Sequence, residues 1–306
     1  MTNYKINRQK NTFFALLAIC FVLCLTFFFG NSKNKAQGLI GKESAILNPK
    51  YKSEICEIRL KLDREELRLT KQNGIWFGQS TDLFFEADAQ KIERLIEELC
   101  SKRTIYQVSA NGALFEDYEL DEKNGFNIKA LLNDQTIAAD LYFGKSNFNG
   151  SLISLRSSKN NNILQTSDNF YTFLYIQTNN WADLQLVKTQ TGHFYNEEVL
   201  QCTINNQPFQ NTGDKNSPNT AATQNALNDY LDLLKTAKGS SLVSKQQFEN
   251  QIPCMQIKIE TLHKIYQFNI FTFGDDFAIV SNGNSFGTNC ALVISAWTYK
   301  RLQPQK

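Results

Sequence analysis

The chain has 306 residues, more than one typical domain of about 100–200 residues, so two small domains with additional segments are the expected organisation. Its 32 Lys and Arg residues are nearly balanced by 30 Asp and Glu residues, and a net charge of +2 provides no large field that would attract nucleic acid. No nucleic-acid partner is therefore expected. Hydrophobic residues make up 42% of the chain and 23 residues are Phe, a composition that excludes disorder throughout.

The N-terminal segment carries the strongest signal in the sequence. Residues 12–29 include no charged side chain, and at about 1.5 Å per residue they span roughly 27 Å, close to the hydrocarbon thickness of a bilayer. Lys5, Arg8 and Lys10 precede this run without an acidic residue between them, which favours a cytoplasmic N-terminus. We therefore predict that residues 1–30 are a signal anchor, that residues 12–29 cross the cytoplasmic (inner) membrane once as a helix, and that the remainder is extracytoplasmic.

Three alternatives stay open for this segment. Gly30-Asn31-Ser32 offers a site for signal-peptidase cleavage, although the apolar run is longer than the roughly 7–15 residues of a cleaved signal. Cys20 and Cys24 would be the acceptors of a lipid anchor, but a large residue precedes each of them where a small one is usual. The opposite orientation, with the C-terminal part in the cytoplasm, is favoured by the positive charges that follow residue 29, namely Lys33, Lys35 and Lys42.

The next segments are a polar tether and a first unit of strands. Residues 31–50 are polar, contain Gly and Pro, and are predicted to be the tether. Ile58, Leu60 and Leu62 alternate with charged residues, which indicates a strand with one buried face. Asn73-Gly74 predicts a tight turn between strands. A small antiparallel meander is therefore expected after residue 50.

An amphipathic helix is predicted to follow the meander and to cover one face of its sheet. Apolar residues recur at helical spacing, with charged residues on the other side, and Asp88 is the candidate N-cap. The apolar positions are Ile92, Leu95, Ile96, Leu99 and Cys100. Short strand candidates separated by Asn, Gly and Ser clusters then complete the unit, at residues 128–132, 138–143, 152–155 and 163–165.

The second half of the chain repeats this order of elements. A second apolar stripe, Leu227, Tyr230, Leu231 and Leu234, lies at one constant sequence separation from the first. Other landmarks align with small shifts: Leu69-Thr70 with Cys202-Thr203, Phe143-Gly144 with Phe273-Gly274, and Ser167, Tyr171 and Leu174 with Ser295, Tyr299 and Leu302. The predicted fold class is α+β, with the transmembrane helix followed by two tandem copies of a mostly antiparallel sheet with one helix on a face, at residues 51–183 and 184–306.

No catalytic, cofactor-binding or metal-binding residue is assigned from the sequence, and no enzyme or cofactor is expected. The two histidines, His193 and His263, lie in no recognisable catalytic or metal-binding pattern and are expected at the surface. Carboxylates that are close in sequence are expected in loops and caps: Asp82, Glu86 and Asp88. Cysteines outside the anchor lack CxxC spacing and are expected to be small buried apolar residues: Cys56, Cys100, Cys202, Cys254 and Cys290.

The order of landmarks resembles the bacterial family called domain of unknown function 4340, over roughly residues 50–306. The residues that carry the resemblance are Asn73-Gly74-Ile75-Trp76, Ala87-Asp88, Val108-Ser109, Tyr118-Glu119-Leu120, Phe143-Gly144 and a hand-over segment centred on Trp181. The chain departs from the family at Glu119-Leu120, where a Gly-Leu step is common. The resemblance implies an envelope protein with tandem α+β units, often encoded beside ABC transporter parts of the gliding-motility auxiliary type, and it provides no catalytic residues.

These expectations combine into one functional hypothesis and one alternative. The first is a non-enzymatic, membrane-anchored extracytoplasmic accessory or scaffold protein, associated with an ABC-type transporter or another envelope complex. The alternative is a ligand-binding or glycan-binding module that uses a cleft between the two copies.

The predicted topology is directly testable. Protease added to spheroplasts should digest residues 31–306, because the basic N-terminus would keep only the start of the chain in the cytoplasm. An immunoblot against a C-terminal epitope measures the loss, with a cytoplasmic protein as the protected control. Survival of the epitope until the membrane is permeabilised would reverse the assigned orientation.

Overall fold

A computed structural model of the protein describes residues 41–167, 169–190, 199–209, 221–282 and 288–303. The predicted membrane helix at residues 12–29 lies outside these ranges. Within them, no helix combines the length and the apolar composition needed to cross a bilayer.

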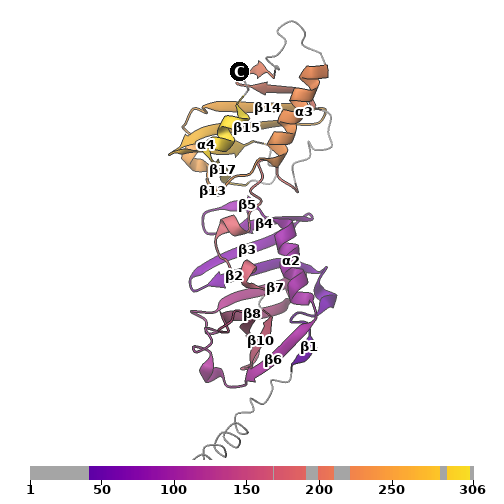
Figure 1. Ribbon diagram of the computed structural model, residues 1–306, viewed down its shortest axis with the longest axis vertical. Coiled ribbons are helices and arrows are strands. Elements are labelled where there is room, and N and C mark those ends of the chain that lie inside the picture. The colour runs from indigo at the N-terminus through magenta and orange to yellow at the C-terminus, as the bar shows by residue number, and fades with distance from the viewer. Residues whose placement is uncertain (1–40, 168, 191–198, 210–220, 283–287, 304–306) are drawn as a thin grey trace, which may run out of the picture.

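The described residues form an α+β fold with two antiparallel sheets and few helices (Figure 1). The order in the ten-stranded sheet is β1 (Lys42–Ser44), β6 (Arg103–Ser109), β10 (Ile163–Ser167), β9 (Leu152–Ser157), β8 (Ile137–Ser146), β7 (Phe126–Leu132), β2 (Ile55–Leu62), β3 (Glu65–Gln72), β4 (Ile75–Gln79) and β5 (Phe84–Glu86). The order in the seven-stranded sheet is β12 (Gln207–Pro208), β11 (Val199–Ile204), β14 (Met255–Thr261), β15 (Ile265–Phe273), β16 (Asp276–Ser281), β17 (Cys290–Ile294) and β13 (Ser241–Ser244).

Helices lie on these sheets or connect their strands. Figure 1 shows α2 across the ten-stranded sheet and α3 across the seven-stranded sheet. The α-helices are α2 (Ala89–Cys100), α3 (Ala221–Thr236) and α4 (Ala296–Leu302). The 3-10 turns are η1 (Pro49–Tyr51), η2 (Gly112–Leu114), η3 (Tyr171–Phe173), η4 (Thr178–Asn180) and η6 (Lys245–Phe248).

The local signals of the first unit are confirmed. Asn73 and Gly74 both have positive φ, 51° and 85°, which is the backbone of a tight hairpin turn that matches strand twist. Asp88 caps α2, because its Oδ1 accepts a hydrogen bond from the Lys91 backbone N–H at 3.0 Å. The predicted apolar stripe of α2 is buried from Ile92 to Cys100.

The predicted tether at residues 31–50 is too long at its C-terminal end. Lys42 in β1 lies opposite Ile105 in β6, so the chain already belongs to the sheet there. Leu47 is 2% exposed, and its backbone N–H donates to the carbonyl of Leu99 at the end of α2. The short apolar run Ala45-Ile46-Leu47 enters the core beside the helix, which is why the folded part begins before residue 51.

The seven-stranded sheet carries one helix more than the sequence predicts. Tyr230 on α3 is buried, and its hydroxyl donates to the carbonyl of Leu302 at the end of α4. Tyr299 on α4 stacks on Phe277 with ring centroids 3.7 Å apart. The prediction of a single helix on this sheet is therefore wrong, because α4 joins α3 in covering it.

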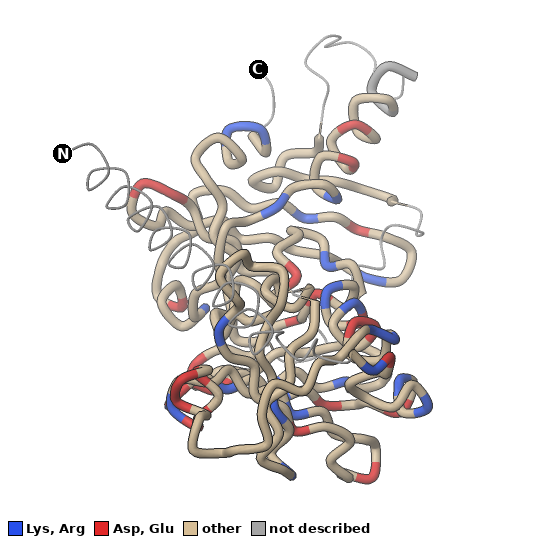
Figure 2. The backbone as a smooth tube through the Cα atoms, turned by 60° about the horizontal axis from the view of Figure 1, so that its bottom comes forward, with Lys and Arg blue, Asp and Glu red and all other residues tan. Residues whose placement is uncertain are grey.

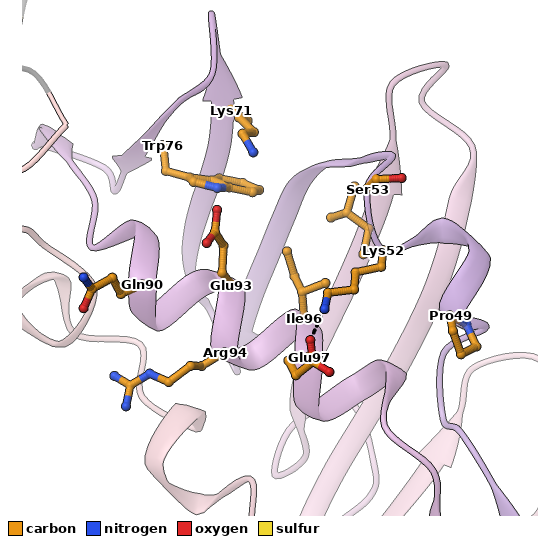
Figure 3. A pocket seen from close by; sticks show the side chains of 11 residues that line it. Pro49, Lys52, Ser53, Lys71, Trp76, Gln90, Glu93, Arg94, Ile96 and Glu97 are labelled. Atoms are coloured by element: carbon orange, nitrogen blue, oxygen red, sulfur yellow. Dashed lines mark hydrogen bonds and ion pairs between the residues drawn. The ribbon is translucent and has the colours of Figure 1, made fainter.

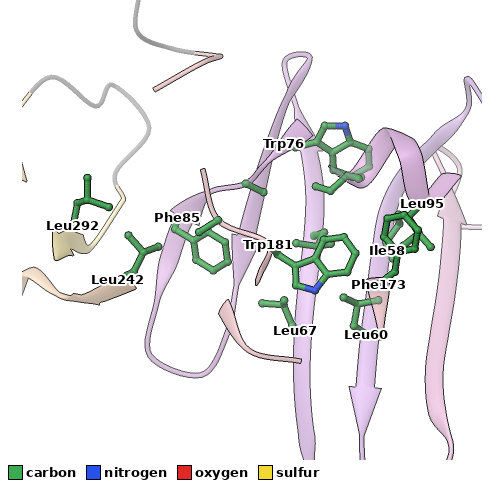
Figure 4. Close-up of a cluster of buried hydrophobic side chains, with 14 of the residues drawn as sticks. Ile58, Leu60, Leu67, Trp76, Phe85, Leu95, Phe173, Trp181, Leu242 and Leu292 are labelled. Atoms are coloured by element: carbon green, nitrogen blue, oxygen red, sulfur yellow. The ribbon is translucent and has the colours of Figure 1, made fainter. Parts of the chain in front are cut away.

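The two sheets are joined by packing and by backbone hydrogen bonds. Leu242 in β13 donates its N–H to the Asn179 Oδ1 of the first unit at 3.1 Å. On the other side of the junction, Asn289 accepts from the Phe84 N–H at 2.7 Å and donates back to the Phe84 carbonyl. Figure 4 shows Leu242 and Leu292 of the second unit on the side of the first that bears Phe85. Buried residues of both units belong to one contiguous core.

Replacing Leu95 or Leu231 with Asp is expected to unfold the corresponding unit. These side chains are 0% and 6% exposed, so a carboxylate would be buried without a partner. The free energy of unfolding should fall by more than about 3 kcal/mol, measured by urea denaturation. Leu262→Asp is the matched control, because Leu262 is 60% exposed and its replacement should cost less than about 0.5 kcal/mol. A cooperatively folded Leu95→Asp variant with native stability would contradict this placement of α2.

Candidate functional site

A groove of about 840 Å³ runs beside α2 in the first unit (Figure 3). We call it the α2 groove. Three parts of the chain form its walls: the segment around η1 and the start of β2, the hairpin of β3 and β4, and the outer side of α2. Its lining residues are Pro49, Lys52, Ser53, Ile55, Lys71, Trp76, Gln90, Glu93, Arg94, Ile96 and Glu97.

Trp76 is the most unusual residue in this groove. The hairpin turn at Asn73-Gly74 starts β4 and places Trp76 on the side of the sheet that faces α2. The residue is 1% exposed, yet its indole Nε1 is buried without a hydrogen-bond acceptor in the described part of the chain. Leaving a buried donor unpaired costs about 1–3 kcal/mol of folding free energy. A bound molecule that offers a hydrogen-bond acceptor to this N–H would recover part of that cost. Figure 3 shows the Nε1 edge of the indole turned toward Glu93.

Charged side chains line the same groove. Lys52 pairs with Glu97, and this hydrogen bond raises the pKa of Lys52. The Lys71 ammonium lies 5.6 Å from the Trp76 ring centroid, within the range of a cation–π contact. Among the described residues, Lys71, Glu93 and Arg94 form no ion pair. Charges of both signs are interspersed along the chain in Figure 2, so recognition in the groove depends on these local charges.

A second groove of about 680 Å³ lies in the second unit, where η6 packs on the sheet. Its amide side chains bond one another, because Asn269 Oδ1 accepts from the Nε2 atoms of Gln256 and Gln267 at 2.9 and 3.0 Å. Phe248 and Phe271 stack at 5.3 Å and are only 3% and 6% exposed. The α2 groove is the stronger candidate, because it is lined by a side chain with an unpaired buried donor.

Two buried carboxylates at the junction of the units hold the backbone rather than a ligand. Glu86 Oε1 accepts from the Gln190 N–H at 3.1 Å. Asp183 Oδ2 accepts from both the N–H and the hydroxyl of Thr189 at 2.7 Å. Burial raises the pKa of the nearby Cys290 thiol, partly offset by the Lys188 ammonium. Because the carboxylates bond to the chain that links the two sheets, their role is to fix that link.

The residues considered from the sequence are dispersed. His263 is exposed in the turn between β14 and β15, as predicted, whereas His193 lies outside the described residues. Asp88 is the helix cap and Glu86 belongs to the junction, so these carboxylates serve separate structural purposes. In the described ranges, no group of three or more His, Cys, Asp or Glu residues could hold a metal ion.

Cysteines occupy more varied positions than the sequence predicts. Cys100 and Cys202 are buried, as expected, but the prediction of burial is wrong for Cys254, which is exposed. Cys56 and Cys290 are half-buried, and all five thiols in the described part of the chain are free. Burial raises the pKa of the Cys202 thiol to about 12.

Iodoacetamide should distinguish these thiols in the folded protein. The reactive form is the thiolate, and the raised pKa of Cys202 leaves that residue protonated at mildly alkaline pH. We expect Cys202 to be alkylated more than about a hundredfold more slowly than Cys254, as measured by peptide mass mapping over time. Labelling in denaturant is the control and should remove the difference. Equal alkylation rates of Cys202 and Cys254 in the folded protein would show that Cys202, on β11, is accessible to the reagent.

Comparison with known proteins gives a family but no activity. An uncharacterized protein of Treponema pallidum (strain Nichols) is 29% identical over 143 residues, which are 45% of this chain and 45% of that protein. The chain thus aligns with less than half the length of this relative. No solved structure matches the chain. The family model described as domain of unknown function (DUF4340) matches residues 76–251, which is more than half of the chain. The protein therefore belongs to the DUF4340 family.

Proposed function

We propose that the protein is a non-enzymatic accessory or scaffold protein, anchored in the inner membrane through residues 12–29, which binds an envelope partner outside the cytoplasm. The observation that carries this proposal is the α2 groove, a concave surface that combines apolar walls, charges of both signs and an unpaired buried donor. Such a combination is typical of a binding surface. An ABC-type transporter is the proposed partner, on the basis of the family resemblance.

The arrangement of the units supports a role at a distance from the membrane. In Figure 1, β1 and the start of the described chain lie at one end of the long axis, and the seven-stranded sheet lies at the other. An N-terminal anchor would therefore hold the first unit near the bilayer and present the second unit away from it. The α2 groove, in the first unit, would face partners close to the membrane surface.

The proposal includes two tandem copies of one unit. Its support is the strand order, which is β6-β10-β9-β8-β7 in the first sheet and β13-β17-β16-β15-β14 in the second. In each series a helix directly precedes the first strand in the sequence, α2 before β6 and α3 before β13. The alignment from sequence needs one change. The sequence aligns Cys202 with Leu69 of β3, but β11 pairs with β14 as β2 pairs with β7, so β11 takes the position of β2.

A non-enzymatic role is supported by the bonds of the polar residues. Asp88, Glu86 and Asp183 all accept backbone N–H groups that define the helix start and the junction. Carboxylates used in this way are poorly placed to take part in proton transfer. The alternative of a small-ligand module is also best served by the α2 groove, because Phe85, Leu242 and Leu292 fill the core where the two units meet.

Site-specific crosslinking in living cells tests the proposed function. A photoreactive phenylalanine analogue at position 94, on the outer side of α2, should crosslink to a membrane protein that mass spectrometry identifies as a transporter subunit. The analogue at position 137 is the control, because Ile137 is 42% exposed and lies outside the groove. Equal yields at both positions, or no product at position 94 in a normally folded chain, would contradict a partner in the groove.

A further inference from the structure

We infer that the α2 groove binds an extended, acidic peptide segment of the partner, with a backbone carbonyl of that segment accepting a hydrogen bond from Trp76 Nε1. This inference rests on the proposed function and specifies the chemistry of the partner. It is carried by three features of the groove: the unpaired indole donor, the balance of free charges, and the apolar wall.

The donor requires an acceptor of small size. Trp76 Nε1 is the polar atom of a side chain that is 1% exposed, and no acceptor in the described residues bonds to it. Glu93 is exposed on the neighbouring turn of α2, and Figure 3 shows its carboxylate at the Nε1 edge of the ring. Rotation of this flexible side chain toward solvent gives access to Nε1. A peptide carbonyl fits there, because it is a single acceptor on a narrow chain.

Charge complementarity selects an acidic segment. Lys52 is neutralised by Glu97, and the remaining charged residues that line the groove are Lys71, Arg94 and Glu93. The groove therefore keeps an excess of positive charge. Lys71 lies over the Trp76 ring, so an acidic side chain next to the bound carbonyl would meet its ammonium group.

The apolar wall favours a peptide over a compact anion. The exposed ring of Pro49 forms the open part of this wall, and Ile55 and Ile96 form its almost fully buried floor, at 3% and 4% exposed. Figure 3 shows Trp76, Ile96 and Pro49 spread along α2 rather than converging on one point. An extended chain places side chains on alternate sides, so an apolar residue contacts this wall while an acidic residue faces Lys71.

Fluorescence anisotropy with two labelled peptides tests the inference on the full chain in detergent micelles. One peptide alternates Val and Glu, and the other alternates Val and Lys, so that both favour an extended conformation and differ in charge. The Val-Glu peptide should bind more tightly, and its affinity should fall as salt is added. Trp76→Phe keeps an aromatic ring and removes the N–H, and it should weaken binding by about two- to tenfold. Trp297→Phe is the matched control, because Trp297 is 65% exposed on α4, outside the groove.

Lys71→Glu is a second variant, and it leaves every core residue unchanged. Lys71 is exposed, so the variant should fold normally, lose affinity for the Val-Glu peptide and gain affinity for the Val-Lys peptide. Thermal unfolding checks that each variant is folded. Stronger binding of Val-Lys to the unmodified protein, no binding of either peptide, or unchanged binding in a folded Trp76→Phe variant would overturn the inference.

The two proposals fail separately. A crosslink from position 94 to a transporter subunit without binding of either peptide would keep the accessory function and reject the acidic segment. Binding of the Val-Glu peptide without any crosslink in cells would keep the chemistry of the groove and reject the proposed partner.

Discussion

The burial of Trp181 fixes the course of the chain where it leaves the first unit. This residue lies in the segment that leaves the first sheet, is 0% exposed, and donates from its indole Nε1 to the Tyr175 carbonyl at 2.7 Å. Its own carbonyl bonds to the N–H of Asp88, the N-cap of α2. A single residue thus fixes the exit of the first unit to the start of the helix. Because α2 forms one wall of the α2 groove, the geometry of the groove depends on this same anchor point.

Beyond Trp181 the chain that links the two units carries buried polar groups, which select one arrangement of that chain. Asp183 and Glu86 accept backbone hydrogen bonds, and Gln190 bonds to the Trp76 backbone through both ends of its amide. Buried polar groups are costly unless they are satisfied, so this network tolerates one arrangement of the linking chain. It also connects the junction to β4, the strand that carries Trp76. A partner bound at Trp76 would therefore contact a part of the sheet that is held directly by the link between the units.

The sequence predicts features that depend on local signals. The apolar stripe of α2, its cap at Asp88, and the turn at Asn73-Gly74 follow from spacing and turn chemistry, and all three are confirmed. Features that depend on distant partners were missed. β1 has only three residues, and its place is set by pairing with β6 about sixty positions away. The fit of α4 depends on Tyr230 and Phe277, which no local pattern connects with it.

The α2 groove also combines a feature that the local sequence indicates with one that depends on distant residues. Trp76 is recognisable from the sequence as the residue after a hairpin turn, and that position usually indicates a core aromatic. The sequence does not reveal that Nε1 lacks an acceptor, because this depends on every residue that surrounds the ring in the fold. A Trp on a strand that faces a helix with unpaired charges on its outer side is the signal that would have pointed to the groove.

The two sides of α2 allow structure and binding to be separated in this protein. Its inner residues, such as Leu95, are fixed in the core, whereas Arg94 on its outer side forms no ion pair within the described chain. Substitutions on the outer side therefore alter recognition at little cost in stability, because surface positions contribute weakly to the free energy of unfolding. Trp76 joins both roles, since its ring packs in the core while its N–H faces the groove. A packed residue with one unsatisfied atom positions a donor rigidly, and that rigidity lowers the entropic cost of binding a flexible segment.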